Sequence, residues 1–324
     1  MEFLHFGCQN EVRKMETAII LGNTKLNYSW FVLTYKQGLE LNGVKVIGID
    51  YKTNTLAKIK DKILKIKPDA IFTHLSFHPH IHNPATMLQF FRDIKSKINT
   101  KVIHTCNDAR THDRYMSDLR GSFDYAFVGT YPMVSNCSEA FKIPVFYVPY
   151  SSLTYEHMGN FSPDLAFKDP VFTGSPQAHR TGWADNRADF IEKLQKIMKI
   201  KIFKTQSAED LRKRTPELSV SAKCILGLCV GYEIEGYMDV RPFQYLGTGA
   251  FMIMRKYMGM EEYIPDNFYI GFDSYDDPMI VKELWEEWKD EDTRKLRQEA
   301  FKFIQENHSC KVRIAEVLKF MKEN

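Results

Sequence analysis

The residues best suited to chemistry lie in the stretch DVRPFQYLGTGAF, which begins at Asp239. Pro242 favours the first turn of a helix, because its missing N–H would have no partner there, and Asp239 can cap that turn. Free N–H groups at a helix start bind anions, and the guanidinium of Arg241 adds a full positive charge. The Gly-Thr-Gly that follows can end the helix and turn the chain into a strand. The stretch predicts either a site for an anion or a diol, or a purely structural strand-helix-strand unit.

A second group of candidates follows two predicted strands in the same half of the chain. A diphosphate that gains negative charge can be stabilised by fixed cations and by backbone N–H groups. Residues of these types occur close together here, and the alternative is that the cations are ordinary solvated side chains. The candidates are Gly174, Ser175, Arg180, Arg187 and Lys204.

The first half carries a histidine cluster directly after a predicted strand. His78, His80 and His82 alternate along the chain, but Pro79 disrupts strand geometry and no matching carboxylate–cysteine set is nearby. We therefore expect no metal there. The cluster fits either a loop beside a substrate, with His78 able to move a proton, or a loop whose imidazoles contact backbone and water.

Short β-branched runs alternate with helical patterns from Thr17 onward, which is typical of parallel β-α-β units. In the first half the pattern predicts strands at 18–21, 44–49, 70–72, 102–104, 125–128 and 145–148, with helices at 29–41, 56–67 and 87–98. In the second half it predicts strands at 171–173, 200–203, 224–230 and 250–254, with helices at 187–198, 208–214, 241–246 and 281–290 and a helical tail at 293–322. The predicted fold class is α/β, with two tandem Rossmann-like, doubly wound domains.

Length and composition agree with a globular protein of two domains. The chain has 324 residues, of which 44% are hydrophobic and 26% charged. No apolar run approaches the roughly 20 residues that cross a bilayer, and the first ten residues lack a signal-peptide pattern. Six scattered cysteines without a C-x-x-C pair favour reduced thiols. We expect a cytoplasmic protein without a transmembrane segment.

Charge is unevenly distributed between the two halves. Residues 1–150 hold 19 Lys and Arg against 13 Asp and Glu, a net charge of +6, whereas residues 151–324 hold 25 against 28, a net charge of −3. A basic half could face an anionic acceptor, although the lysines at 58–67 also fit a solvated helix face.

Several motifs in the second half resemble the CgeB-like (spore-maturation-protein type) glycosyltransferases of the GT-B group. The matching segments are Val171-Phe-Thr-Gly-Ser with Arg187, the run R-P-F-Q-Y-L-G-T-G-A-F, Met258-Gly-Met-Glu-Glu-Tyr-Ile, and Glu306-Asn-His-Ser-Cys-Lys-Val-Arg313. The resemblance covers roughly residues 145–315. The first 140 residues match only in general layout.

The resemblance implies a GT-B-like fold with a cleft between an acceptor-side domain, residues 1–152, and a nucleotide-sugar domain, residues 153–305. Residues 306–324 would form a helix that crosses back to the first domain. The donor would be a nucleoside-diphosphate sugar, UDP- or GDP-linked, bound by Arg241, Phe243, Gln244 and Glu262 in addition to the second group of candidates. In related enzymes a glutamate stands at the position of Gln244 and bonds the ribose, and the neutral amide is a weaker diol acceptor.

On the acceptor side, Asp108 stands where related enzymes often carry an aspartate facing the cleft, with His112 within reach and His78 as a proton carrier. The resemblance favours retention at the anomeric carbon, without a metal or cofactor. The carboxylates at 273–277 are expected to cap the helix that follows them.

The acceptor stays open among a glycan, a protein, a small molecule and modified DNA. One alternative is a transferase for modified bases in DNA, to which the basic first half would supply phosphate contacts. Another is a sugar-nucleotide-binding module that has lost catalysis, which Gln244 would suit. Nicotinamide-dependent oxidoreduction lacks its G-x-G-x-x-G turn, because the first strand ends in LGNTKL.

Overall fold

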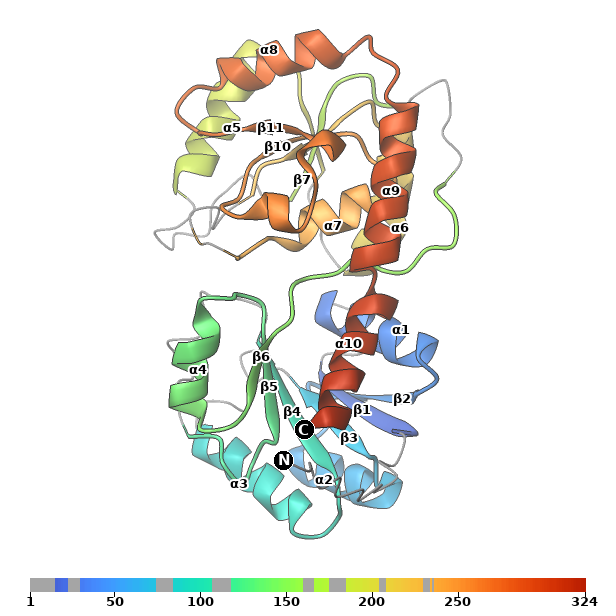
Figure 1. Ribbon diagram of the computed structural model, residues 1–324, viewed down its shortest axis with the longest axis vertical. Coiled ribbons are helices and arrows are strands. Elements are labelled where there is room, and N and C mark those ends of the chain that lie inside the picture. The colour runs from blue at the N-terminus through green and yellow to red at the C-terminus, as the bar shows by residue number, and fades with distance from the viewer. Residues whose placement is uncertain are drawn as a thin grey trace, which may run out of the picture.

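The chain folds into two α/β lobes that are stacked along the long axis of the molecule (Figure 1). The computed structural model describes residues 15–22, 30–73, 84–106, 118–159, 166–174, 185–203, 208–229, 234 and 236–324. Within these residues each lobe contains one parallel sheet with helices on both faces. None of the described helices is long and apolar enough to span a membrane.

The first lobe contains a six-stranded sheet of order β2-β1-β3-β4-β5-β6, in which every pairing is parallel. Its strands are β1 (Thr17–Gly22), β2 (Lys45–Asp50), β3 (Ala70–Thr73), β4 (Lys101–Cys106), β5 (Tyr125–Val128) and β6 (Val145–Tyr147). Its helices are α1 (Trp30–Leu41), α2 (Leu56–Ile66), α3 (Pro84–Lys95), α4 (Met133–Phe141) and, from the end of the chain, α10 (Cys310–Glu323).

Two hydrophobic cores lie on the two faces of this sheet. Successive residues of a strand point to opposite faces, so Ile19 and Leu21 join the core under α2, α3 and α4. Ala18 and Ile20 join the core under α1 and α10. Burial on both faces explains why these strands are continuous apolar runs.

The second lobe contains a five-stranded parallel sheet of order β11-β10-β9-β7-β8. Its strands are β7 (Val171–Thr173), β8 (Lys201–Phe203), β9 (Ile225–Gly227), β10 (Met252–Arg255) and β11 (Ile270–Phe272). Helices α6 (Ala208–Ser221), α7 (Val240–Leu246) and α9 (Arg294–His308) cover one face, and α5 (Asp185–Ile197) and α8 (Met279–Trp288) cover the other. The short helices η3 (Met260–Glu262) and η4 (Asp266–Phe268) lie between β10 and β11.

The structure differs from the sequence pattern in the length and number of several elements. Helix α6 continues past Pro216, where the pattern predicted an end at 214, and α4 and β11 were not predicted. The predicted tail at 293–322 is two helices, because Ser309 adopts an extended conformation with φ −71° and ψ 157°. Asp277, which precedes the N-cap residue Pro278, accepts a bond from the amide of Met279, the first residue of α8, at 2.8 Å.

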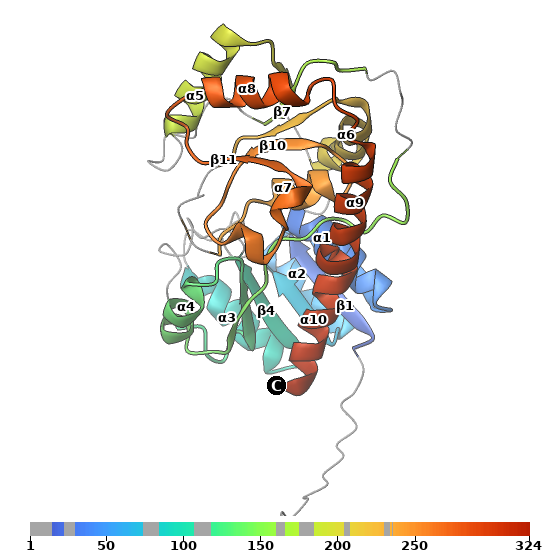
Figure 2. The same cartoon turned by 45° about the horizontal axis from the view of Figure 1, so that its top comes forward.

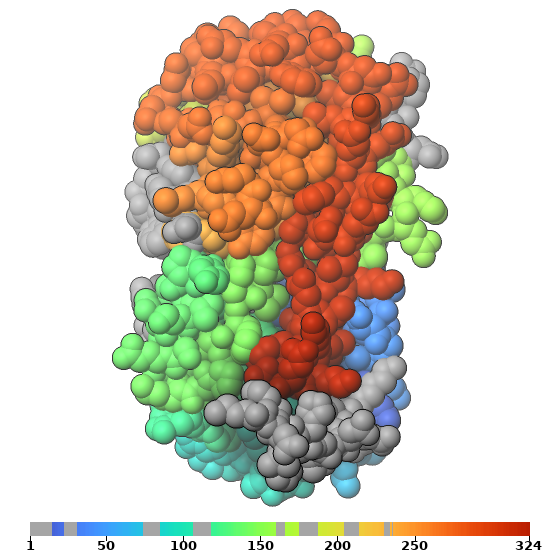
Figure 3. Space-filling view, in the orientation of Figure 1, coloured from blue at the N-terminus to red at the C-terminus, as the bar shows by residue number. Residues whose placement is uncertain are grey.

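The chain crosses between the lobes twice, and the two crossings are hydrogen-bonded to each other. The amide of Ser152 donates to the carbonyl of His308 at 2.9 Å, and the amide of Cys310 donates to the carbonyl of Ser152 at 2.7 Å. Helices α9 and α10 follow one another along the same side of both lobes, as Figures 2 and 3 show. The break at Ser309 lies at this crossing, so α9 packs on the second lobe and α10 packs on the first.

His308 and Arg313 are the histidine and arginine of the terminal motif, and they contact each other across the break. The Arg313 guanidinium donates to Nδ1 of His308. Burial lowers the pKa of His308 to about 4, the positive charge of Arg313 acts in the same direction, and a bond to the backbone of Tyr263 partly opposes them. His308 is therefore a neutral acceptor in the folded protein.

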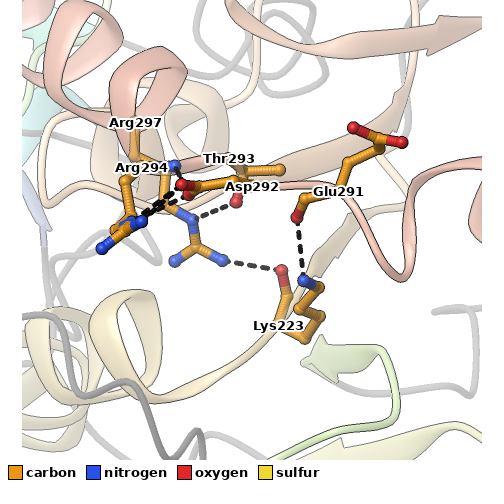
Figure 4. Close-up of polar contacts among 6 residues, drawn as sticks. All are labelled: Lys223, Glu291, Asp292, Thr293, Arg294 and Arg297. Carbon is orange, nitrogen blue, oxygen red and sulfur yellow. Dashed lines mark hydrogen bonds and ion pairs between the residues drawn. The ribbon is translucent and has the colours of Figure 1, made fainter.

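Arg297 fixes the end of α6, and its side chain is fully buried (Figure 4). Its guanidinium donates to the carbonyls of Ser219 at 2.9 Å, Ala222 at 2.9 Å and Lys223 at 2.6 Å. Its Nε donates to Oγ1 of Thr293 at 3.0 Å. A cation that satisfies the last carbonyls of a helix also interacts favourably with the helix dipole.

We expect Arg297→Met to lower the free energy of unfolding by on the order of 3 kcal/mol, because at least two bonds from a charged donor to buried carbonyls are lost. Chemical denaturation of the two proteins measures this difference. Arg294→Met is the matched control, since Arg294 lies on the same helix with its side chain 64% exposed and paired to Asp292. Equal stability of the two variants would contradict the role given to Arg297.

His308 should make stability depend on pH between its ordinary pKa of 6.5 and its folded value of about 4. Between these values the imidazole is protonated in the unfolded chain but not in the folded protein. The contribution of neutral His308 to the free energy of unfolding is therefore complete above pH 6.5 and is lost as pH falls. One pKa unit corresponds to about 1.4 kcal/mol, so wild type should lose about 3 kcal/mol more than His308→Gln between pH 7 and pH 4. Denaturation at a series of pH values tests this, and parallel curves for the two proteins would refute it.

Candidate functional site

The carboxyl ends of both sheets meet where the lobes touch. Thr130, which follows β5, forms an antiparallel bridge with Tyr237, which follows β9. The hydroxyl of Tyr147, at the end of β6, donates to the carbonyl of Gly236 at 3.0 Å. In open parallel sheets, ligands bind beyond the carboxyl ends of the strands, so this edge is where a site would form.

Helix α7 begins at this edge, and Asp239 occupies its start. Asp239 is the N-cap, and its carboxylate accepts a bond from the amide of Arg241 at 3.4 Å and pairs with the Arg241 guanidinium at 2.5 Å. Pro242, the third residue of the helix, has no N–H. The cap occupies the amide of Arg241 and Pro242 has none, so this turn offers an anion fewer free amides than the sequence pattern predicted.

The guanidinium of Arg241 lies instead over the carboxyl end of β7. A Cβ atom placed on Gly174 would be 3.1 Å from Nη2 of Arg241, and Gly174 has a φ of +127° that other residues rarely adopt. Glycine thus allows both the backbone turn and the close approach. Of the Arg241 side chain 23% remains exposed, so its charge can still reach a ligand.

Arg187, near the start of α5, brings a second guanidinium to the same edge. The residue is 8% exposed, and its Nη1 donates only a long bond of 3.4 Å to the carbonyl of Leu228. Among the described residues, Nε has no partner and no carboxylate pairs with the group. Burial lowers the pKa of Arg187, and the charge of Arg241 lowers it further. The structure thus places Gly174, Arg187 and Arg241 at the same edge of the second sheet.

Two tyrosine hydroxyls form hydrogen bonds at the strand ends that carry these groups. Tyr245 donates to Oγ1 of Thr173 at 2.5 Å, and Tyr275 donates to the carbonyl of Cys229 at 2.6 Å. Sequence reasoning missed both tyrosines, because their partners are 72 and 46 residues away. It also missed the ion pair of Asp239, although the Asp-x-Arg spacing was a visible signal.

The remaining described candidates lie in different surroundings. Phe243 is fully buried in the core and packs on the ring of His308 at 5.3 Å, so the predicted donor contact of its side chain is corrected to packing. Gln244 is 2% exposed, and its Nε2 has no partner among the described residues. Glu262 is exposed on η3 and close enough to Tyr147 of the first lobe to raise its pKa, after the larger effects of burial and Tyr263.

The other candidates lie outside the described residues and stay predictions. They are Asp108, His112, His78, Ser175, Arg180 and Lys204. The described part of the chain contains no group of three His, Cys, Asp or Glu side chains placed to bind a metal ion. The prediction of a reaction without a metal also stays a prediction.

Comparison with known proteins identifies the second half of the chain. Residues 179–319 match the model of a protein family described as glycosyl transferase-like. A search of curated protein sequences found no match. The family model is not specific to the CgeB-like group, so that closer resemblance is still an expectation.

Similar solved structures span almost the whole chain. An alpha-glucosyltransferase in complex with UDP-glucose and DNA containing an abasic site has a TM-score of 0.67 at 11% identity, covering 95% of this chain and 100% of that one. A glycosyltransferase from Rickettsia africae has a TM-score of 0.58 at 12% identity, covering 96% and 99%. HepE of Anabaena, in complex with UDP-glucose, has a TM-score of 0.56 at 10% identity, covering 95% and 100%.

At these identities the likeness establishes the fold. Two parallel α/β sheets of six and five strands, with helices on both faces, match the GT-B glycosyltransferase structures over both lobes. The predicted fold class is confirmed: the chain has the GT-B fold, and its second half is glycosyl transferase-like in sequence.

Proposed function

We propose that this protein is a glycosyltransferase that takes its sugar from a nucleoside diphosphate bound at the carboxyl edge of the second sheet. One observation carries the proposal: Arg241 lies beside Gly174, and the buried Arg187, close enough for its charge to be repelled by that of Arg241, lacks a carboxylate partner among the described residues. The glycosyl transferase-like match at residues 179–319 supports it, because this range includes both arginines.

The arrangement suits the charge that develops during sugar transfer. When the glycosidic bond breaks, its electron pair goes to the departing diphosphate, and fixed cations in a site of low dielectric stabilise that charge. Asp239 orients Arg241 and offsets one of the two positive charges. The pair of arginines with one aspartate therefore keeps a net positive charge for a phosphate group.

The nucleotide and the sugar belong to the same proposal. Two of the structural neighbours are complexes with UDP-glucose, which supports a UDP-linked hexose, with a GDP-linked donor as the alternative. Gln244 would face the ribose with a neutral amide. We propose retention at the anomeric carbon without a metal, with Asp108, His112 and His78 on the acceptor side.

A second candidate acceptor is modified DNA. The net charge of +6 in residues 1–150 favours it, and one structural neighbour is a glucosyltransferase in complex with DNA. Phosphate contacts would make duplex binding fall steeply with salt concentration. Absence of duplex binding at low salt would leave a glycan, a protein or a small molecule as the acceptor.

We expect UDP or GDP to raise the melting temperature of the wild-type protein. Arg241→Ala should weaken the binding of that nucleotide by about 1.5 to 3 kcal/mol, the range for a hydrogen bond to a charged group. Titration calorimetry measures the affinities. Arg294→Ala is the matched control, because Arg294 pairs with Asp292 in the same Asp-x-Arg arrangement on an exposed surface. If no nucleoside diphosphate stabilises the wild type, the proposed function is wrong.

Arg187→Met should separate a ligand-binding arginine from a structural one. The buried guanidinium is repelled by Arg241 and makes one long hydrogen bond, so its removal should leave the melting temperature of the free protein unchanged or higher. The same variant should weaken nucleotide binding by on the order of 2 kcal/mol. A large drop in melting temperature with unchanged affinity would instead assign Arg187 to the fold.

A further inference from the structure

Gln305, on α9, binds two other segments of the chain through one side-chain amide. Its Oε1 accepts a bond from the amide of Tyr155 at 2.9 Å. Its Nε2 donates to the carbonyl of Leu153 at 3.0 Å and to the carbonyl of Gly247 at 2.7 Å. Tyr155 and Leu153 belong to the first crossing between the lobes, whereas Gly247 ends α7. Gln305 therefore connects the crossing to α7.

The end of α7 also packs directly on that crossing. A Cβ atom on Gly247 would be 2.3 Å from Oγ of Ser152, so only glycine allows this contact without a shift. On its α9 side, α7 is held by Phe243, which packs on His308. The carboxyl end of α7 is thus fixed by the crossing and by α9 together.

Helix α7 transmits this position to the donor site. It has seven residues, and at 1.5 Å per residue it is about 10 Å long. Five of them, Pro242 to Leu246, are buried, so the helix has little freedom to bend. A shift at Gly247 must therefore move Asp239 and Arg241 at the other end, relative to Gly174.

We propose that Gln305 is a positioning residue for the donor site: its bonds to Gly247 and to the crossing hold α7 so that Arg241 lies over the carboxyl end of β7. The inference rests on the proposed function, since it assigns Gln305 an effect on the same nucleotide. Gln305 touches no part of that site and acts only through α7.

Gln37 provides a matched comparison within the same crossing. It lies on α1 of the first lobe, and its amide exchanges two bonds with the backbone of Thr154, at 2.9 and 3.0 Å. Gln37 thus binds the crossing as Gln305 does, but among the described residues it makes no bond to α7. A purely structural effect should be shared by the two glutamines, whereas an effect on the nucleotide should be specific to Gln305.

The test is a double-mutant cycle read by calorimetric titration with UDP and GDP. Gln305→Met should lower the affinity for the nucleotide that wild type binds by about tenfold. Gln37→Met should leave that affinity within about twofold of wild type, even if both substitutions lower the melting temperature. In a protein that already carries Arg241→Ala, Gln305→Met should lower nucleotide affinity by less than about a further threefold, because the guanidinium that Gln305 positions is gone.

Full additivity of the two substitutions, or equal effects of Gln305→Met and Gln37→Met on affinity, would overturn the inference. Should Gln305→Met fail to fold, Gln305→Glu carries the same cycle, since it keeps an acceptor for Tyr155 but loses the donor to Gly247. If wild type binds neither nucleotide, the proposed function has failed. If wild type binds and Gln305→Met binds equally well, only the positioning role has failed.

Discussion

The placement of two like charges at one edge of a parallel sheet is the constraint on which this structure depends. A guanidinium that leaves water must be paired or richly hydrogen-bonded, and Arg187 is neither among the described residues. Arg241 is kept in place by Asp239, which also caps the helix that carries it. Glycine at 174 then allows the charge to lie against the backbone of β7.

The two buried arginines of the second lobe show how such a group can be assigned. Arg297 is completely buried, yet four acceptors receive its donors, and this satisfaction is what a structural role requires. Arg187 is almost as buried but has one long bond and a like charge beside it. Burying the Arg187 guanidinium without a partner lowers stability. This burial is explained if an anionic ligand pairs with the guanidinium, since binding sites commonly retain such uncompensated groups.

Much of the fold could be predicted because its strands are buried on both faces and therefore read as apolar runs. The strands at 125–128 and 171–173 have the predicted bounds, since glycine, proline or charge follows them closely. The extension of α6 could not be predicted, because Arg297, which stabilises its end, is 74 to 78 residues away from the carbonyls that it binds. The break at Ser309 depends on the crossing at Ser152, which is equally remote in sequence.

The site was predictable where chemistry and local spacing coincide. Arg241 beside a proline and a glycine turn indicated an anion site, and the structure places its charge at the expected strand end. The group available to an anion differs from the prediction. The Asp239 carboxylate accepts the bond from the Arg241 amide, which the sequence pattern had assigned to a ligand, so the guanidinium of Arg241 remains. Phe243 was misassigned since periodicity within a seven-residue helix does not show which side faces the core.

The position of α7 between the crossing and the proposed donor site links the architecture to the chemistry. In a fold of two lobes, closure excludes water from the reaction, so binding should depend on how the lobes are joined. Here the joining segments and the arginine share one short buried helix, through Gly247 at one end and Asp239 at the other. A change in the angle between the lobes would therefore reach Arg241, the proposed diphosphate-binding cation, directly, without a long path through the sheet.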